Sequence, residues 1–344
     1  MKPKQKTALV TGAGGFIGHH LVRYLKGQGY FVVGVDLKKP EFEETNADIF
    51  IRFDLRVPEE AFATHNGEGK CFDEVYALAA DMGGISHITT HNAEILYNNA
   101  MINLSTLDAA KRVGIEKYLY TSSACVYPES KQLDTNVTPL KESDAYPAEP
   151  DTEYGWEKLF TERLCIHYRT DYGMDTRIVR FHNIFGPKGT WIGGREKAPA
   201  ALCRKVAVAK LCHLPSIDIW GDGEQTRSFC YIDDCVRGIY QIMQSDYPHP
   251  INLGQDRMVS INELAKIIMD IAEYQCELVH IPGPLGVRGR NSDNTTITKE
   301  IGWKPEISLE EGLRRTYNWI QENVNFELVK GADPQDLARS VVYT

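Results

Sequence analysis

Short apolar runs alternate with longer segments of helical periodicity through the first half of the chain. Six of these runs predict strands, at residues 7–10, 31–35, 49–51, 74–78, 117–120 and 176–181. Three segments predict helices, at residues 16–26, 95–113 and 152–171. Strands that alternate with helices are typical of parallel βαβ units, and continuous apolar strands indicate burial on both faces of a sheet. We therefore predict an α/β fold with a Rossmann-type, doubly wound parallel sheet.

The pattern loosens after about Asn183. Residues 184–189 are rich in turn formers, which indicates a crossing into a second domain. Shorter helices are predicted beyond this crossing, at residues 198–210, 234–243, 261–272 and 310–323. The second half of the chain therefore reads as a separate, smaller α/β unit.

These patterns predict a division into domains. We expect a Rossmann domain over residues 1–183, to which parts of about 228–255 return. A smaller C-terminal α/β substrate domain is expected over residues 184–330. A Gly-Ala-Asp-Pro run ends the last predicted helix, so we expect a loosely held tail over residues 331–344.

Composition and charge exclude some classes of function. Of the 344 residues, 42% are hydrophobic and 25% are charged, which is typical of a globular protein that buries a core. Its 38 basic and 47 acidic side chains give a net charge of −9. We therefore expect no nucleic-acid partner and no membrane partner, and an anionic substrate would need a local cationic pocket. Residues 1–6 contain no long apolar segment, so we expect no signal peptide, no transmembrane helix and a cytoplasmic location.

The cysteines are scattered along the chain. The eight are Cys71, Cys125, Cys165, Cys203, Cys212, Cys230, Cys235 and Cys276. None form a CxxC pair or lie at zinc-ligand spacing from a histidine, so we predict no metal site. In an intracellular enzyme such cysteines are usually small buried residues. We keep this interpretation for all of them except Cys125, whose neighbourhood carries other chemistry.

A glycine-rich turn lies between the first predicted strand and the first predicted helix. Gly12, Gly15 and Gly18 have the spacing GxxGxxG, and Phe16 and Ile17 begin the helix. Glycine permits a tight turn and a close approach of the backbone to a pyrophosphate, which the free N–H groups of the helix N-terminus then bind. We predict that these five residues bind a dinucleotide.

Two acidic residues follow the next two predicted strands. Asp36 closes the second strand, where a carboxylate binds a ribose 2′-hydroxyl and repels a 2′-phosphate. The predicted cofactor is therefore NAD rather than NADP. Asp54 follows the third strand and is predicted to hydrogen-bond the adenine. Because strand, loop, helix and acidic residue occur in order, we favour a cofactor site over a plain strand–helix turn.

A predicted helix carries Tyr154 and Lys158, four residues apart and therefore on one face. Tyrosine, with a pKa of about 10, is a poor base at neutral pH, but a neighbouring ammonium and a positive nicotinamide lower that pKa. Ser123 ends the fifth predicted strand and is placed to hydrogen-bond the same substrate hydroxyl. A lone YxxxK pattern is more often a solvated helix face. Our prediction of an oxidation site therefore depends on the glycine loop and on this serine.

These motifs together resemble the extended short-chain dehydrogenase/reductase family of nucleotide-sugar epimerases and dehydratases. The resemblance covers about residues 7–325, and it includes the runs 78–80, 180–187 and 227–234. It implies NAD as cofactor, a nucleotide-sugar substrate and a homodimer. These features do not by themselves select the reaction.

More specific segments resemble the GDP-mannose 3,5-epimerases of that family. They lie at residues 79–84, 122–129, 141–145, 147–150, 193–200, 220–227 and 282–293. So many unusual runs in one order argue against chance. The resemblance implies epimerisation of GDP-D-mannose at C3 and C5 to GDP-L-galactose, through a transient oxidation at C4.

The same resemblance implies the catalytic residues. Tyr154 removes the proton of the C4 hydroxyl, supported by Lys158 and Ser123, while NAD takes the C4 hydride. The resulting ketone acidifies the hydrogens at C3 and C5, and Cys125 and Lys197 exchange them as base and acid from opposite faces of the ring. The pKa of a thiol, about 8.5, falls near cations, and a lysine pKa falls on burial, so both groups suit this work near neutral pH.

The resemblance also implies substrate contacts. Arg290 is expected to pair with the pyrophosphate of GDP, with Arg227 as a further cation. Asn183 and Gln225 are expected to hydrogen-bond the substrate, and Gly83 to let the backbone approach the sugar. The predicted substrate-binding set is completed by Ser123, Cys125, Glu196 and Lys197. For Arg227, Asn183, Gln225 and Gly83 taken singly, ordinary turn chemistry explains the residue about as well.

Other functions stay open. Another nucleotide-sugar 4-epimerase would need neither the thiol nor the lysine of the second domain. A 4,6-dehydratase usually carries a Thr, Asp and Glu set where this chain has Ser123-Ala124-Cys125. A non-catalytic NAD-binding regulator belongs to a different class on the same fold. The intact set Ser123, Tyr154 and Lys158 argues against that class.

Overall fold

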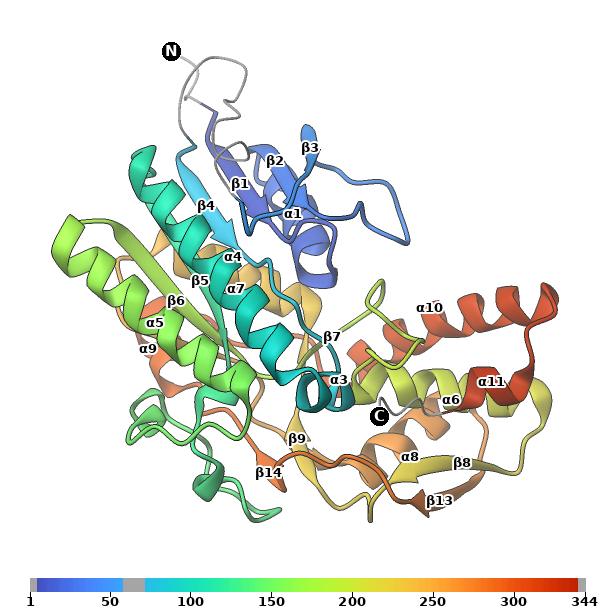
Figure 1. Cartoon of the computed structure of the whole chain (residues 1–344). Helices are drawn as coiled ribbons and strands as arrows, with labels where there is room; N and C mark the ends of the chain where they lie inside the picture. The colour runs from blue at the N-terminus through green and yellow to red at the C-terminus, as the bar shows by residue number, and fades with distance from the viewer. Residues whose placement is uncertain (1–4, 58–71, 340–344) are drawn as a thin grey trace.

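The computed structural model describes residues 5–57 and 72–339. Its main element is a seven-stranded parallel sheet with the spatial order β11-β6-β5-β4-β1-β2-β3 (Figure 1). In chain order its strands are β1 (Thr7–Thr11), β2 (Phe31–Asp36), β3 (Ile49–Arg52), β4 (Glu74–Ala77), β5 (Lys117–Ser123), β6 (Asp175–Phe181) and β11 (Ile251–Leu253). The sheet confirms the predicted Rossmann-type, doubly wound α/β fold.

The strand order reverses between β1 and β4, and this reversal sets the place of a binding site. From β1 the order runs through β2 to β3, whereas from β4 it runs through β5 to β6 in the opposite direction. Ligands of open α/β sheets bind in the crevice that such a reversal leaves at the carboxyl ends of the strands. Every residue of β1 and β4 is buried, as expected of strands covered on both faces.

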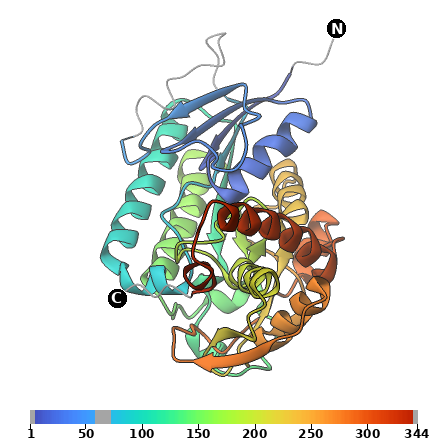
Figure 2. The same cartoon turned by 90° about the vertical axis from the view of Figure 1, so that its right-hand side faces the viewer.

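Helices cover both faces of the sheet. One face carries α4 (Asn92–Arg112) and α5 (Glu153–Tyr172), which pack side by side, and the other carries α1 (Phe16–Gly27) and α7 (Ile232–Gln244) (Figures 1 and 2). A short helix, α3 (Ile85–Thr90), precedes α4 and was not predicted, because six residues are too few to show helical periodicity. Among the helices of the described ranges, none is both long and apolar enough to cross a membrane.

The remaining elements form a smaller lobe beside the carboxyl edge of the sheet. Its helices are α6 (Ala198–Cys212), α8 (Ile261–Ala272), α10 (Leu309–Val329) and α11 (Pro334–Ala338), whereas α9 (Thr295–Ile301) contacts β11 of the large sheet. Its short strands are β7 (Ile184–Phe185), β8 (Ser216–Trp220), β9 (Thr226–Ser228), β10 (Cys230–Tyr231), β12 (Met258–Ser260), β13 (Glu277–Ile281) and β14 (Gly289–Arg290). Within this stretch of chain, α7 and β11 return to the large sheet, where β11 pairs with β6.

The last described segment packs against the smaller lobe. Helix α11 contacts α6, and Leu337 is buried there. The guanidinium of Arg204, in α6, donates hydrogen bonds to the carbonyls of Leu337 and Arg339. The part of the predicted tail up to residue 339 thus has a defined place, which its composition did not indicate. Residues 340–344 lie outside the described ranges.

Candidate active site

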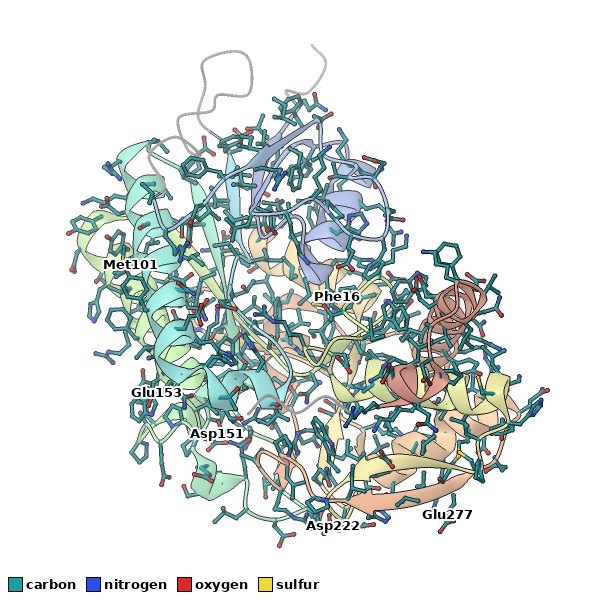
Figure 3. The ribbon with its side chains drawn as sticks, turned by 45° about the vertical axis from the view of Figure 1, so that its right-hand side comes forward. Phe16, Met101, Asp151, Glu153, Asp222 and Glu277 are labelled. Atoms are coloured by element: carbon teal, nitrogen blue, oxygen red, sulfur yellow. The ribbon has the colours of Figure 1, made fainter. Side chains whose placement is uncertain are left out.

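A cavity of about 610 Å³ lies between the carboxyl edge of the sheet and the smaller lobe. Phe16, at the start of α1, lies on the side of the sheet that faces this lobe (Figure 3). The predicted site residues that line the cavity are Gly12, Gly15, Phe16, Ile17, Gly18, Asp36, Gly83, Ser123, Cys125, Tyr154, Lys158, Asn183, Glu196, Lys197, Gln225, Arg227 and Arg290. Segments from both halves of the chain therefore meet in one place.

The glycine loop has the geometry of a phosphate cradle. Gly12 has φ +70°, and a Cβ there would lie 2.8 Å from the backbone nitrogen of Ala79. A Cβ on Gly18 would lie 2.0 Å from the Gly12 carbonyl oxygen. Gly15 caps α1 without a side chain that could occupy the N–H groups of the first turn. These groups therefore stay available for an anion.

Asp36 and Asp54 differ in where they lie. Asp36 ends β2, lines the cavity and accepts a hydrogen bond from the Gly14 N–H at 3.0 Å; burial raises its pKa. The loop and this carboxylate fit a dinucleotide with a free ribose 2′-hydroxyl. Asp54 instead pairs with Arg56 at 2.6 Å, and this hydrogen bond lowers the pKa of Asp54. Asp54 is not among the residues that line the cavity, and its contact with the adenine stays a prediction.

Tyr154, Lys158 and Ser123 converge as predicted from their spacing. Lys158 Nζ lies 5.4 Å from the Tyr154 ring centroid and donates to the Thr121 carbonyl at 3.1 Å. Tyr154 is hydrogen-bonded to Ser123. Burial raises the pKa of Tyr154 and lowers that of Lys158. The expected lowering of the tyrosine pKa is thus not a property of the protein groups alone, because desolvation outweighs them; it needs the positive charge of a cofactor.

Cys125 is held beside Tyr154 by a close contact between two backbones. It lies in the 3-10 turn η1 (Ala124–Val126), and its N–H donates to Ser123 Oγ at 3.2 Å. A Cβ on Gly155 would lie 2.1 Å from the Cys125 carbonyl oxygen. Only glycine therefore allows α5 to approach η1 this closely. Gly155 is a residue that the sequence analysis passed over, since the positions inside YxxxK vary.

The segment before α6 brings Lys197 to the same cavity. Gly84 N–H donates to the Arg195 carbonyl at 3.0 Å, and a Cβ on Gly84 would lie 2.7 Å from the Glu196 carbonyl oxygen. The Glu196 carboxylate pairs with Arg204 at 2.7 Å and accepts the Gly194 N–H at 2.6 Å. Burial lowers the pKa of Lys197. Glu196 is thus occupied by protein groups, and it shapes the loop that carries Lys197.

The other predicted substrate residues line the far side of the cavity. Asn183 adopts a left-handed conformation, φ 46°, and its Nδ2 donates to the Ser228 carbonyl at 2.9 Å. Gln225 Nε2 donates to the Trp220 carbonyl at 3.3 Å. Arg227 donates to two backbone carbonyls, and burial lowers its pKa to about 9. These three side chains donate to backbone carbonyls. Arg290 differs from them, because its guanidinium contacts a side chain, Cys125 Sγ, at 3.4 Å.

Some lining residues carried no sequence signal. Lys205 lines the cavity and donates to the Asp218 carbonyl; burial lowers its pKa to about 8. Gln225 Oε1 and Trp220 Nε1 are buried and lack hydrogen-bond partners within the described part of the chain. Lys205 lies inside α6, where the sequence shows no motif, whereas Trp220 and Gln225 belong to the family-like segment 220–227. With Arg227 and Arg290, Lys205 supplies the local cationic pocket that an acidic protein needs for an anionic substrate.

Comparison with known proteins agrees with this geometry. Residues 8–254 match the model of the NAD dependent epimerase/dehydratase family. The chain is 50% identical to GDP-mannose 3,5-epimerase 1 of Oryza sativa subsp. japonica over 96% of its length and 86% of that protein. It is also 50% identical to GDP-mannose 3,5-epimerase of Arabidopsis thaliana, over 94% of its length and 84% of that protein.

A solved structure with the same architecture is UDP-glucose 4-epimerase of Thermotoga maritima with UDP-glucose. The two chains have a TM-score of 0.82 at 27% identity, over 92% of this chain and 99% of that one. UDP-glucuronic acid 4-epimerase of Bacillus cereus, in complex with UDP-glucuronic acid and NAD, has a TM-score of 0.74 at 26% identity over 92% and 99% of the two chains. The chain belongs to the NAD dependent epimerase/dehydratase family, and it is an NAD-dependent epimerase.

Proposed function

We propose that this enzyme converts GDP-D-mannose to GDP-L-galactose by inverting C3 and C5. The observation that carries the proposal is that Cys125 and Lys197 line the same cavity as Ser123, Tyr154 and Lys158. A 4-epimerase would need only the last three. The names of the relatives at 50% identity support the choice of substrate.

The first step is oxidation at C4. NAD, when bound, accepts the C4 hydride and later returns it. Tyr154 takes the C4 hydroxyl proton, and Ser123 holds that hydroxyl. Lys158, buried beside the tyrosine and hydrogen-bonded to a backbone carbonyl, stabilises the phenolate. The C4 ketone makes the hydrogens on C3 and C5 acidic.

The second step is proton exchange at carbon. Cys125 and Lys197 reach the cavity from different segments, η1 and the start of α6, which supports action from opposite faces of the ring. Cys125 removes a proton, and Lys197 delivers one to the other face. Burial lowers the pKa of Lys197, which favours release of its proton near neutral pH. Return of the hydride to C4 completes an isomerisation without net oxidation.

The cations that line the cavity suit a nucleoside diphosphate. Arg227, Arg290 and Lys205 all line it, so they favour binding of the GDP part. Gly83, Asn183, Glu196 and Gln225 line the same cavity, which supports the proposal that they belong to the substrate-binding set. Contacts of these side chains with the guanine and the sugar stay predictions.

Isotope exchange tests the reaction directly. GDP-mannose is incubated with the enzyme in deuterated water, and the recovered sugar nucleotides are followed by NMR. We expect deuterium at C3 and C5 together with the galacto product. Inversion at C4 without any deuterium on carbon would instead identify a 4-epimerase and contradict the proposal.

We also infer a homodimer that forms through α4 and α5. These helices pack together on the outer face of the sheet and expose Tyr97, Leu104, Trp156 and Phe160 by 40–63%; Met101 lies on α4 in the same stripe (Figure 3). A continuous apolar face of this kind marks an association surface. The cytoplasmic location stays a prediction.

Substitution on this face tests the homodimer. Phe160→Glu is expected to give a monomer by size-exclusion chromatography with light scattering, because it places a charge in the apolar stripe. Phe326→Glu is the matched control, since Phe326 is 57% exposed on α10, away from α4 and α5. If both variants are monomers, or if both remain dimers, the assignment of the interface is wrong.

A further inference from the structure

The guanidinium of Arg290 has a different neighbour at each of its three nitrogens. Nη1 donates to Cys125 Sγ at 3.4 Å, and Nε donates to Gln132 Oε1 at 2.5 Å. Nη2 lies 3.7 Å from Asp151 Oδ1. Asp151 lies just before α5 (Figure 3). Arg290 is 7% exposed, so this arrangement is shielded from bulk water.

Gln132 is well suited to hold the arginine in place. It is fully buried and follows the 3-10 turn η2 (Glu129–Lys131). Its Nε2 donates to the carbonyls of Tyr127 and Pro128 at 3.1 and 3.0 Å, which fixes the amide and turns Oε1 toward Arg290. Its own carbonyl accepts N–H groups from the strand that carries Arg290. Both ends of the residue therefore tie this strand to the η1–η2 segment.

Charged groups surround the Cys125 thiol on several sides. Lys158 and Tyr154 reach it from α5, Lys197 from the start of α6, and Arg227 from β9, and each interacts electrostatically with it. The lysines and Arg227 have pKa values lowered by burial. Asp151 is an anion beyond Arg290. Arg290 is therefore the cation in direct hydrogen-bond contact with the sulfur, and an arginine keeps its charge across the working pH range.

We propose that Gln132 is a positioning residue that, with Asp151, holds Arg290 against Cys125, so that the guanidinium stabilises negative charge on the sulfur when Cys125 acts as base. The step involved is loss of the thiol proton to solvent, with no other bond made or broken. An opposite charge within about 4–6 Å favours the charged form of an ionisable group by roughly 1–3 pH units. The inference rests on the proposed function, in which Cys125 is the carbon base. It adds a residue outside the cavity that acts only through Arg290.

The pH profile of thiol alkylation tests this proposal without turnover. The NAD-loaded enzyme is treated with iodoacetamide between pH 5 and 10, and the peptide that contains Cys125 is quantified by mass spectrometry, so that other cysteines do not contribute. Arg290→Met is expected to raise the midpoint of the profile by about one unit or more, which slows alkylation at pH 7 about tenfold. Gln132→Met, which removes the acceptor at nearly constant volume, is expected to slow it about three- to tenfold.

A double-mutant cycle separates positioning from a general structural role. If Gln132 acts through Arg290, Gln132→Met adds nothing to the midpoint in the Arg290→Met background. Equal additive shifts, or an unchanged midpoint in Gln132→Met, would overturn the proposal. If Gln132→Met no longer retains NAD, the midpoint of the alkylation profile is measured in Arg290→Lys instead. One ammonium cannot face all three partners, so the midpoint must still rise although the charge is kept, and a wild-type midpoint would contradict the proposal.

The same variants distinguish this inference from the proposed function. Deuterium exchange at C5 reports whether Cys125 acts on carbon, whereas alkylation reports only the state of the sulfur. If exchange persists in Cys125→Ala while the alkylation cycle behaves as expected, the base has been assigned wrongly but the positioning holds. If exchange requires Cys125 while the cycle is additive, the positioning role is wrong and the proposed function stands.

Discussion

Cys125 differs from other cysteines of this chain in what surrounds its sulfur. Cys165, Cys203 and Cys230 are fully buried, and burial raises the pKa of each of these thiols. They fit the interpretation as small buried residues. Cys125 instead faces a cavity lined with cations and touches a guanidinium. Position in the fold, rather than residue type, therefore distinguishes the surroundings of Cys125 from those of the buried thiols. Cys71 lies outside the described residues.

The roles assigned to single residues predict separable defects. Cys125→Ala and Lys197→Ala are each expected to lower the rate of deuterium exchange on carbon by about 10²–10⁴-fold, because each removes one partner of proton transfer. Both variants should still bind NAD and still form the reduced nicotinamide on adding GDP-mannose, followed by absorbance. Tyr154→Phe should lose that signal as well. Cys165→Ala is the control thiol, and full exchange activity in Cys125→Ala would refute the assignment.

His182 predicts a pH dependence of stability. It is fully buried, with Nε2 2.9 Å from Asn252 Oδ1, and burial lowers its pKa to about 3. The unfolded chain has an ordinary histidine pKa of about 6.5, so it binds a proton that the folded protein rejects. Stability from this group is complete above pH 6.5 and falls as the pH drops toward 3, by about 2 kcal/mol at pH 5.

Urea unfolding at pH 7 and pH 5 measures this loss. The free energy of unfolding of His182→Gln is expected to fall about 2 kcal/mol less than that of the wild type between the two pH values, because glutamine does not titrate. Parallel losses in both proteins would show that His182 does not control the acid sensitivity.

At the scale of elements, glycines let segments from different parts of the chain meet. Gly155 allows α5 to touch η1, which sets Tyr154 beside Cys125. Gly84 allows the start of α3 to touch the loop that carries Lys197. In both places a backbone carbonyl occupies the space that a side chain would need. The proposed catalytic groups are thus brought together by close packing of backbones.

This packing predicts a sharp effect of one methyl group. Gly155→Ala places a Cβ where the Cys125 carbonyl lies, so η1 must shift; we expect a loss of about 1–3 kcal/mol in stability and a lower kcat. Gly27→Ala is the matched control, because Gly27 ends α1 and no atom lies within 4 Å of the place that a Cβ would occupy, and alanine favours helix. Thermal unfolding and the exchange assay measure both variants. Equal behaviour of the two would contradict the close-contact argument.

At the scale of the whole molecule, the end of the described chain is linked to the site. Arg204 contacts the carbonyls of Leu337 and Arg339 with one nitrogen and pairs with Glu196 through another. Glu196 precedes Lys197 and receives the Gly194 N–H. A buried guanidinium must keep all these partners, because an unpaired one is costly. Docking of α11 is therefore connected to the loop of the proposed acid.

Disruption of this docking predicts a defect far from the mutated side chain. Leu337→Asp puts a charge where a leucine is 4% exposed, and we expect a loss of about 2–3 kcal/mol in stability together with slower deuterium exchange. Asp336→Asn, on the exposed side of the same helix, is the control and should leave both quantities unchanged. A destabilised Leu337→Asp with wild-type exchange would show that the tail does not influence the Lys197 loop.

The sequence by itself determined the parts of this protein that depend on short-range relations. Alternating strands and helices specified the parallel sheet, and the glycine loop, Asp36 and the Tyr154–Lys158 pair followed from spacings within single elements. Such relations are set by backbone geometry, so a pattern of residues is enough to predict them. The contact of Asp54 with the adenine stays a prediction, and the ion pair of Asp54 with Arg56 was not part of it.

Only the tertiary structure decided which distant residues share the cavity and in what electrostatic setting. Arg290 contacts Cys125, and Glu196 is held by Arg204, and no spacing in the sequence indicated either contact. Lys205 and Gly155 carried no signal, because their importance comes from what packs against them. Burial raises the pKa of Tyr154 in the protein alone, and burial is a property of the assembled fold. Contacts across long sequence separations and desolvation depend on how the whole chain packs, and no local pattern encodes them.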